Sequence, residues 1–174
     1  MFKHLVSAWR RFLNPPPSVT DAQRVAAEFR KEVKGEPRLI VFVEHPGGWG
    51  HVSGYAVMFQ EGKSAFVEEW EMEMRTGKIV KDKSRQAIAP EVLEDLLRKV
   101  REIGWPLEGK DYDLTDSGWS EIGVVVDEQA HFMGMHGRPI PLDSDPQGRV
   151  IKAILECIKS IKEANASKGG AGAP

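Results

Sequence analysis

Two histidines at the ends of a glycine-rich stretch are the residues of this chain best suited to metal chemistry. The stretch is HPGGWGH, with His45 and His51 at its ends. Imidazole nitrogens are common zinc ligands, and glycines let a backbone come close to a bound group. A catalytic zinc usually needs a third protein ligand. His131 and His136 are available for that position, although no spacing here matches a zinc signature. A metal-dependent enzyme built around His45 and His51 is therefore the second of two functional hypotheses.

Three glutamates alternate along the predicted strand at residues 65–74. Glu69, Glu71 and Glu73 share one face, because successive side chains of a strand point to opposite faces. The other, apolar face carries Phe66, Trp70, Met72 and Met74. Like charges this close repel each other, so the glutamates either lie in solvent or meet a basic partner. We therefore take the three glutamates as candidate partner-binding residues and assign no catalytic residue.

The first 14 residues predict an amphipathic helix. Its large apolar side chains recur at helical spacing: Phe2, Leu5, Val6, Trp9, Phe12 and Leu13. Lys3, Arg10 and Arg11 add positive charge, and no acidic residue precedes Asp21. A contiguous exposed apolar face marks an interaction site. The candidate partner-binding residues of this face are Phe2, Leu5, Trp9 and Phe12.

A proline linker at residues 15–17 separates this segment from the rest of the chain. The apolar face can pack on its own domain, on a second copy, on another protein or on a membrane. Three cationic residues give modest attraction to lipid, and no lipidation signal accompanies them. We expect a protein partner or self-association, with peripheral membrane contact through residues 1–14 as the less favoured alternative.

Composition limits the remaining classes of function. The 174 residues carry a net charge of −2, so no nucleic-acid partner is expected. The single cysteine, Cys157, excludes an internal disulfide. No apolar run approaches the ~20 residues of a membrane span, and the N-terminus lacks the pattern of a secretory signal. We expect a cytoplasmic location and no cofactor.

Residues 88–106 predict the clearest helix. Pro90 suits its first position, and Gly104 suits the left-handed position that ends a helix. Trp105 would then fold back onto Val100. One apolar stripe runs along the segment: Val92, Leu93, Leu96, Leu97, Val100 and Ile103. A second strong helix follows Asp145 as cap and Pro146 as first residue.

The order of the remaining patterns predicts an α+β fold. Strands are expected at residues 38–44, 52–60, 65–74, 119–127 and 130–136. Ile79 and Val80 could begin a short return strand, with residues 81–86 as a charged connection. The order is then α-βββ-α-ββ-α after the N-terminal amphipathic helix, with a largely antiparallel sheet of about five strands and helices on one face. We expect a single domain over residues 18–163 and a flexible Gly- and Ala-rich tail over residues 164–174.

Without a catalytic or cofactor motif, these patterns favour a non-catalytic cytoplasmic protein-binding module. An adaptor, a chaperone-like protein or an immunity-type protein would each fit such a chain. The alternative is the metal-dependent enzyme with its site around residues 45–51.

Overall fold

The computed structural model describes residues 22, 23, 25–27, 38–45, 52–73, 79–112, 118–126, 129–137 and 141–169. The strands are β1 (Arg38–His45), β2 (Val52–Glu61), β3 (Ser64–Glu73), β4 (Ile79–Ile88), β5 (Lys110–Asp111), β6 (Trp119–Val126) and β7 (Gln129–His136). Between and after them come helix α3 (Pro90–Ile103), the short 3₁₀ helix η1 (Leu142–Ser144) and helix α4 (Pro146–Gly169). The predicted segments at residues 1–14 and 15–17 lie outside the described residues.

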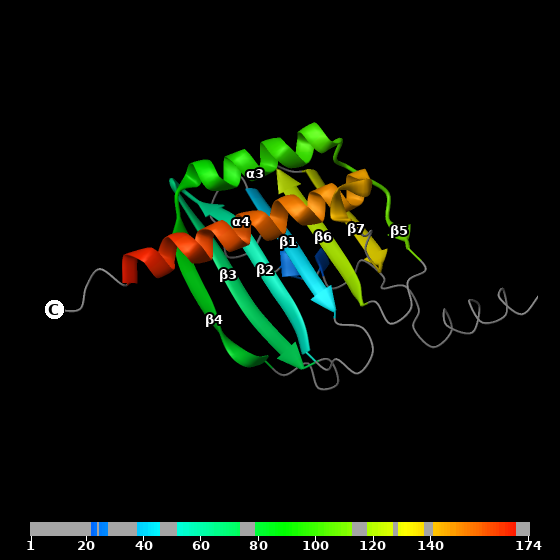
Figure 1. Ribbon diagram of the computed structural model, residues 1–174. Coiled ribbons are helices and arrows are strands. Elements are labelled where there is room, and N and C mark those ends of the chain that lie inside the picture. Colours follow the sequence, from blue (N-terminus) through cyan, green and yellow to red (C-terminus); the bar gives the residue numbers. More distant parts are fainter. Residues whose placement is uncertain are drawn as a thin grey trace, which may run out of the picture.

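The strands form one sheet in the order β4-β3-β2-β1-β6-β7-β5 (Figure 1). All pairs of neighbours are antiparallel except β5 and β7, which run parallel. The first four strands form a meander, and α3 then carries the chain back across the sheet. The α+β class and the largely antiparallel sheet are confirmed, with seven strands in place of about five.

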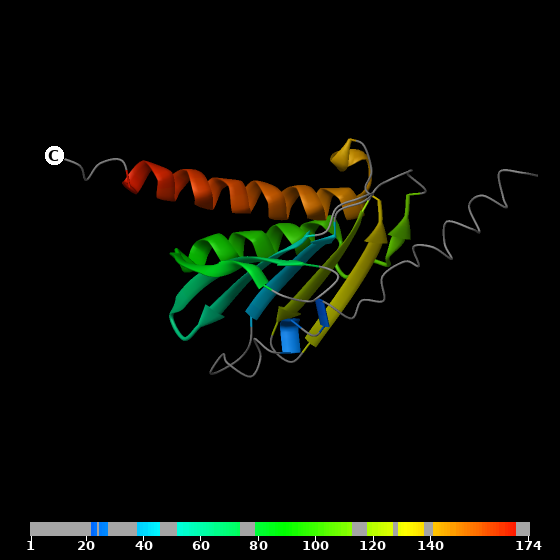
Figure 2. The ribbon, with the colours of Figure 1, turned by 90° about the horizontal axis from the view of Figure 1, so that it is seen from below.

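Both faces of the sheet are covered. Helices α3 and α4 lie on one face, and the helical residues 22, 23 and 25–27 lie on the other (Figure 2). Each side has its own apolar core. The prediction of helices on one face therefore holds for α3 and α4 but not for residues 22, 23 and 25–27.

Strand β1 shows why its sequence is apolar almost throughout. Ile40 and Phe42 pack into the core beneath α3 and α4, while Leu39, Val41 and Val43 pack into the core on the opposite face. A strand buried on both faces needs an unbroken apolar run in place of alternation. β1 is therefore the centre of the sheet, between β2 and β6.

Strand β3 buries side chains on both of its faces. Ala65 and Val67 pack beneath the two helices, whereas Phe66 packs against the second core. The apolar face that carries Phe66 therefore lies on the side of the sheet opposite α3 and α4. Both faces of the sheet are covered, so an apolar side chain can be buried on either one.

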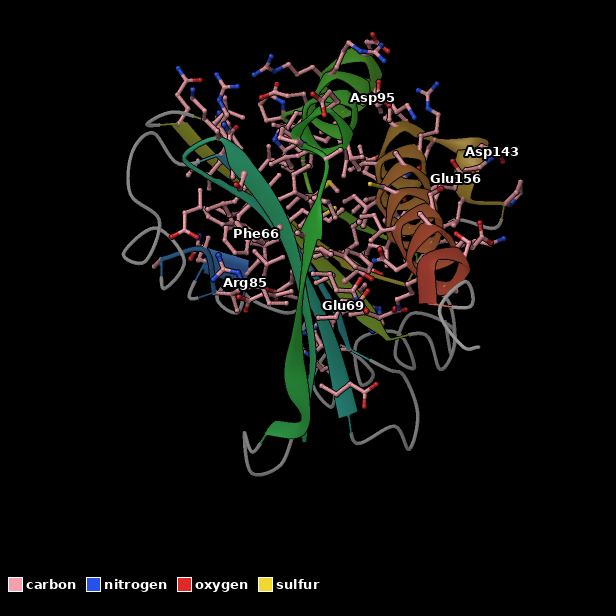
Figure 3. The ribbon with its side chains drawn as sticks, turned by 90° about the vertical axis from the view of Figure 1, so that its left-hand side faces the viewer. Phe66, Glu69, Arg85, Asp95, Asp143 and Glu156 are labelled. Atoms are coloured by element: carbon pink, nitrogen blue, oxygen red, sulfur yellow. The ribbon has the colours of Figure 1, made fainter. Side chains whose placement is uncertain are left out.

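Strand β4 occupies the region predicted as a charged connection at residues 81–86. At this edge of the sheet, Arg85 contacts residues of β2 and β3 (Figure 3). Its Nη2 lies 2.5 Å from Glu61 Oε2, and its Nη1 lies 3.9 Å from Glu68 Oε1. Its guanidinium carbon also lies 4.1 Å from the centre of the Phe66 ring. These contacts let a charged sequence form a ten-residue edge strand.

The ends of α3 are as predicted. Pro90 begins the helix, and Gly104 follows it with φ of 112°. The Gly104 N–H donates to Arg101 O at 2.9 Å, and the Trp105 N–H donates to Val100 O at 3.2 Å. This pair of hydrogen bonds is the Schellman motif, which satisfies carbonyls that would otherwise lack a donor.

Helix α4 begins at the predicted cap. The Gly148 N–H donates to Asp145 Oδ1 at 2.9 Å, as expected for an N-cap carboxylate. The helix continues to Gly169, so it includes residues 164–169, which the sequence placed in a tail. The Asn165 amide donates to Gln86 Oε1 at 2.7 Å and so ties this last part to β4. Among the described residues, no helix combines the length and the apolar character needed to cross a bilayer.

Candidate functional site

A groove of about 760 Å³ lies between α3 and α4. Figure 3 shows the two helices beside one another, with Asp95 on α3 and Glu156 on α4. The groove is lined by Ala87, Ile88, Ala89, Glu91, Val92, Asp95, Leu96, Lys99, Ala153, Glu156, Cys157, Ser160, Ile161, Ala164 and Asn165. Along α4 the lining runs from Ala153 to Asn165, which corresponds to about 18 Å of helix.

The groove exists because the helix flanks that meet there carry small side chains. Each helix directs its large apolar stripe at the sheet, including Leu93 of α3 and Ile154 of α4, both fully buried. The flank of α4 that lines the groove instead presents Ala153, Cys157, Ser160 and Ala164. These four residues recur at i, i+4, i+7 and i+11, the spacing of one helical face. Small residues on this face leave the space between the helices unfilled.

Acidic groups dominate the rim of the groove. The charged lining residues are Glu91, Asp95, Lys99 and Glu156. Three carboxylates against one ammonium group leave a formal charge of −2. The Lys99 ammonium lies 3.1 Å from Asp95 Oδ2, and its hydrogen bond, with a second from Arg98, lowers the pKa of Asp95. The rim therefore stays negative at neutral pH, and a positively charged ligand would be favoured.

Cys157 forms part of the apolar wall of the groove. Its Sγ lies 3.9 Å from Met58 Sδ in strand β2, beneath the helices. Burial raises the pKa of the Cys157 thiol, so the neutral form predominates at pH 7. A neutral, half-buried thiol behaves as a small apolar side chain. The floor between the rims is therefore suited to apolar contacts.

His45, one of the two predicted metal ligands, lies away from the groove. His45 ends β1 on the face opposite α3 and α4, where its side chain is buried. Its ring centre lies 4.7 Å from that of Trp119, and its Nε2 lies 4.0 Å from Glu121 Oε1. His51 lies outside the described residues. The metal site of the alternative hypothesis therefore stays a prediction.

The two other histidines separate to opposite faces of the sheet. His136 pairs with Trp119, which also pairs with His45, so the three occupy one row across β7, β6 and β1. His131 lines a second, smaller hollow beside α3, on the helix-covered face. Among the described residues, no three His, Cys, Asp or Glu side chains lie close enough together to hold a metal ion.

The three candidate glutamates of β3 have different surroundings. Glu69 is half-buried beneath α4, where Lys162 Nζ lies 3.0 Å from its Oε2. Glu71 is exposed, and the side chain of Glu73 lies outside the described part of the chain. One of the three glutamates thus has a basic partner within its own fold. Their role in binding another protein stays a prediction.

The candidate residues of the N-terminal segment, Phe2, Leu5, Trp9 and Phe12, also lie outside the described residues. The groove was not predicted from the sequence. A signal for it was present, since the small residues of α4 form a face of their own beside the apolar stripe. Only the packing of α3 against α4 shows that this face is left uncovered by large side chains.

Comparison with known proteins adds no family to this picture. No protein-family model matches the chain, and no curated protein matches its sequence.

Proposed function

We propose that the protein is a non-catalytic protein-binding module, of the adaptor, chaperone-like or immunity type, that receives a helical segment in the groove between α3 and α4. The observation that carries this proposal is the groove itself. It has an apolar floor about 18 Å long between charged rims. Helix-in-groove recognition uses this geometry, with ligand side chains at i, i+3, i+4 and i+7 as anchors.

The charge of the rims specifies the ligand further. A formal charge of −2 around an apolar floor favours an amphipathic helix whose polar face is basic. We also propose that the module acts in the cytoplasm. Reducing conditions there would keep the Cys157 thiol of the groove wall free of disulfides.

A substitution that fills the groove tests the proposal. Ser160 is exposed and lines the groove, so Ser160→Trp should occupy the binding space without disturbing the core. The matched control is Lys159→Trp, which places the same side chain on the neighbouring exposed residue, outside the groove lining. Thermal unfolding of both variants should show that they remain folded.

The measurement is the affinity for helical peptides selected from a displayed library against the full chain. We expect the selected peptides to be basic and amphipathic, and Ser160→Trp to weaken their binding about tenfold or more, a cost of at least about 1.4 kcal/mol. Lys159→Trp should bind as the original protein does. Peptides that bind both variants equally well, or no selected peptide at all, would contradict the proposal.

A further inference from the structure

Resting on the proposed groove-binding function, we infer that the helix received by the groove is residues 1–14 of a second copy of this chain. The segment has the required chemistry. It combines six large apolar residues at helical spacing with Lys3, Arg10 and Arg11 and no acidic residue. Its positive charge complements the rim carboxylates Glu91 and Glu156.

The lengths of segment and groove agree as well. Fourteen helical residues span about 21 Å, and the groove lining along α4 spans about 18 Å. The apolar residues of the segment extend from Phe2 to Leu13, nearly its whole length. The segment can therefore fill the groove and leave little apolar surface exposed.

The position of Ala22 keeps residues 1–14 of the same copy from reaching the groove. The Ala22 N–H donates to Glu121 Oε2 at 2.8 Å, and Ala22 is fully buried on the face opposite α3 and α4. The chain from residue 14 to residue 22 can span at most about 29 Å. This connection, which we call the tether, is anchored at Ala22 on the face of the sheet opposite the groove (Figure 2).

The path that such a tether would need is longer than its reach. The layers on either side of a sheet lie about 10 Å from it, so about 20 Å separates Ala22 from the helix layer. The chain cannot cross the sheet and must go around it. The nearer lateral edge, past β7 and β5, is two strand spacings or about 10 Å from β6, and the groove wall at Cys157 lies over Met58 of β2, four spacings or about 19 Å from that edge. With about 10 Å of height on each side, the straight legs are about 14 Å out and about 22 Å back, or about 36 Å in total. The route past the end of β6 at Trp119 needs about 12 Å out and about 22 Å back, which also exceeds the reach of about 29 Å. A second copy meets no such limit.

Reciprocal docking of two segments would give a closed, symmetric dimer, because each copy offers one segment and one groove. Cys157 reports on groove occupancy directly, since it is the only cysteine and lies in the groove wall. Its rate of reaction with a bulky aromatic disulfide should fall as the protein concentration rises. At a total concentration of about ten times the dissociation constant, about a fifth of the chains stay monomeric, so the loss should be about fivefold.

Variants of the full chain identify the segment and the groove. Trp9→Glu with Phe12→Glu should abolish the protection of Cys157 and the dimer seen by sedimentation equilibrium. Glu91→Lys with Glu156→Lys should weaken both effects. Adding Arg10→Glu and Arg11→Glu to that groove variant should restore them by exchanging the charges. The control is Glu108→Lys, an exposed glutamate outside the groove lining, and it should change neither measurement.

Three outcomes would overturn the inference. Protection that does not depend on concentration would place the segment in the groove of its own chain. Equal reactivity in the original protein and in the Trp9→Glu, Phe12→Glu variant would show that residues 1–14 do not occupy the groove. Pelleting with anionic vesicles that requires Trp9 and Phe12, with no protection of Cys157, would make lipid the ligand of the segment. In each case, displayed peptides that still bind the groove would leave the proposed function standing.

Discussion

At the scale of single residues, Asp145 connects the start of α4 to strand β5 and the loop after it. Besides capping the helix, its Oδ2 accepts hydrogen bonds from Tyr112 Oη at 2.8 Å and Lys110 Nζ at 3.0 Å. Burial, together with this hydrogen bond, raises the pKa of Tyr112. Burial alone would raise the pKa of Asp145. The hydrogen bonds from Gly148, Lys110 and Tyr112 outweigh that effect and lower it. The folded state therefore favours the carboxylate over the carboxylic acid.

We predict that Asp145→Ala lowers the free energy of unfolding by about 1–2 kcal/mol at pH 7, because the helix loses its cap. The lowered pKa of Asp145 fixes the pH dependence. Its stabilisation is fully present above the ordinary pKa of 3.8 and is lost as the pH falls through the folded-state value. Denaturant titrations from pH 7 downward should show the original protein and the variant converging below about pH 3.8. A difference that stays constant across this range would contradict the role of the carboxylate.

At the scale of elements, α3 depends on the stripe that it buries against the sheet. Leu96 is 2% exposed and packs into the core beneath the helices. We predict that Leu96→Ala costs about 2–5 kcal/mol in denaturant titrations, through lost burial and the cavity left behind. Glu94→Ala on the exposed face of the same helix is the control. It removes only a surface ion pair with Arg38, so its effect should stay within about 1 kcal/mol. A loss below about 1 kcal/mol for Leu96→Ala would mean that this face does not hold α3 to the sheet.

The helical residues 22, 23 and 25–27 are held to the opposite face by a buried carboxylate. Glu121 is 1% exposed, and its Oε2 accepts the hydrogen bond from the Ala22 N–H. We predict that Glu121→Ala costs about 1–3 kcal/mol, because it leaves this buried donor without its acceptor. Glu121→Gln keeps an acceptor oxygen at the same position and should cost less. Amide hydrogen exchange at Ala22 should accelerate in the alanine variant and change little in the glutamine variant. Equal exchange in all three proteins would show that Glu121 does not anchor this segment.

Elements whose signals are local could be predicted from the sequence, and elements defined by distant partners could not. Pro90, Gly104 and Asp145 mark helix ends through their own backbone and side-chain chemistry, and the structure has these ends where they were expected. Strand β4 has only the pair Ile79 and Val80 as a local signal, at its start. Its Arg85 is stabilised by residues of β2 and β3 that only the folded sheet brings near. The second apolar core was missed for the same reason, since it needs Ala22, Val25 and Ala26 to cover the far face.

At the scale of the whole molecule, the groove is a product of two helices that are more than forty residues apart in sequence. Each apolar stripe could be recognised alone, but the distance between the helices is set by packing both of them on the same sheet. The small side chains on one face of α4 form a groove wall only because Val92 and Asp95 of α3 line the groove with them. Among the candidate residues that the structure describes, Glu69, Glu71 and His45 do not line the groove.

The most direct test of the central claim is a map of where a bound helix touches the protein. Backbone amide spectra of the full chain should be recorded while a selected basic, amphipathic peptide is added. If the helix binds in the groove, shift changes should concentrate on Glu91–Lys99 of α3 and Ala153–Asn165 of α4, and they should be lost in Ser160→Trp. Shift changes confined to the opposite face of the sheet, around His45 and Glu121, would show that the groove between α3 and α4 is not the binding site.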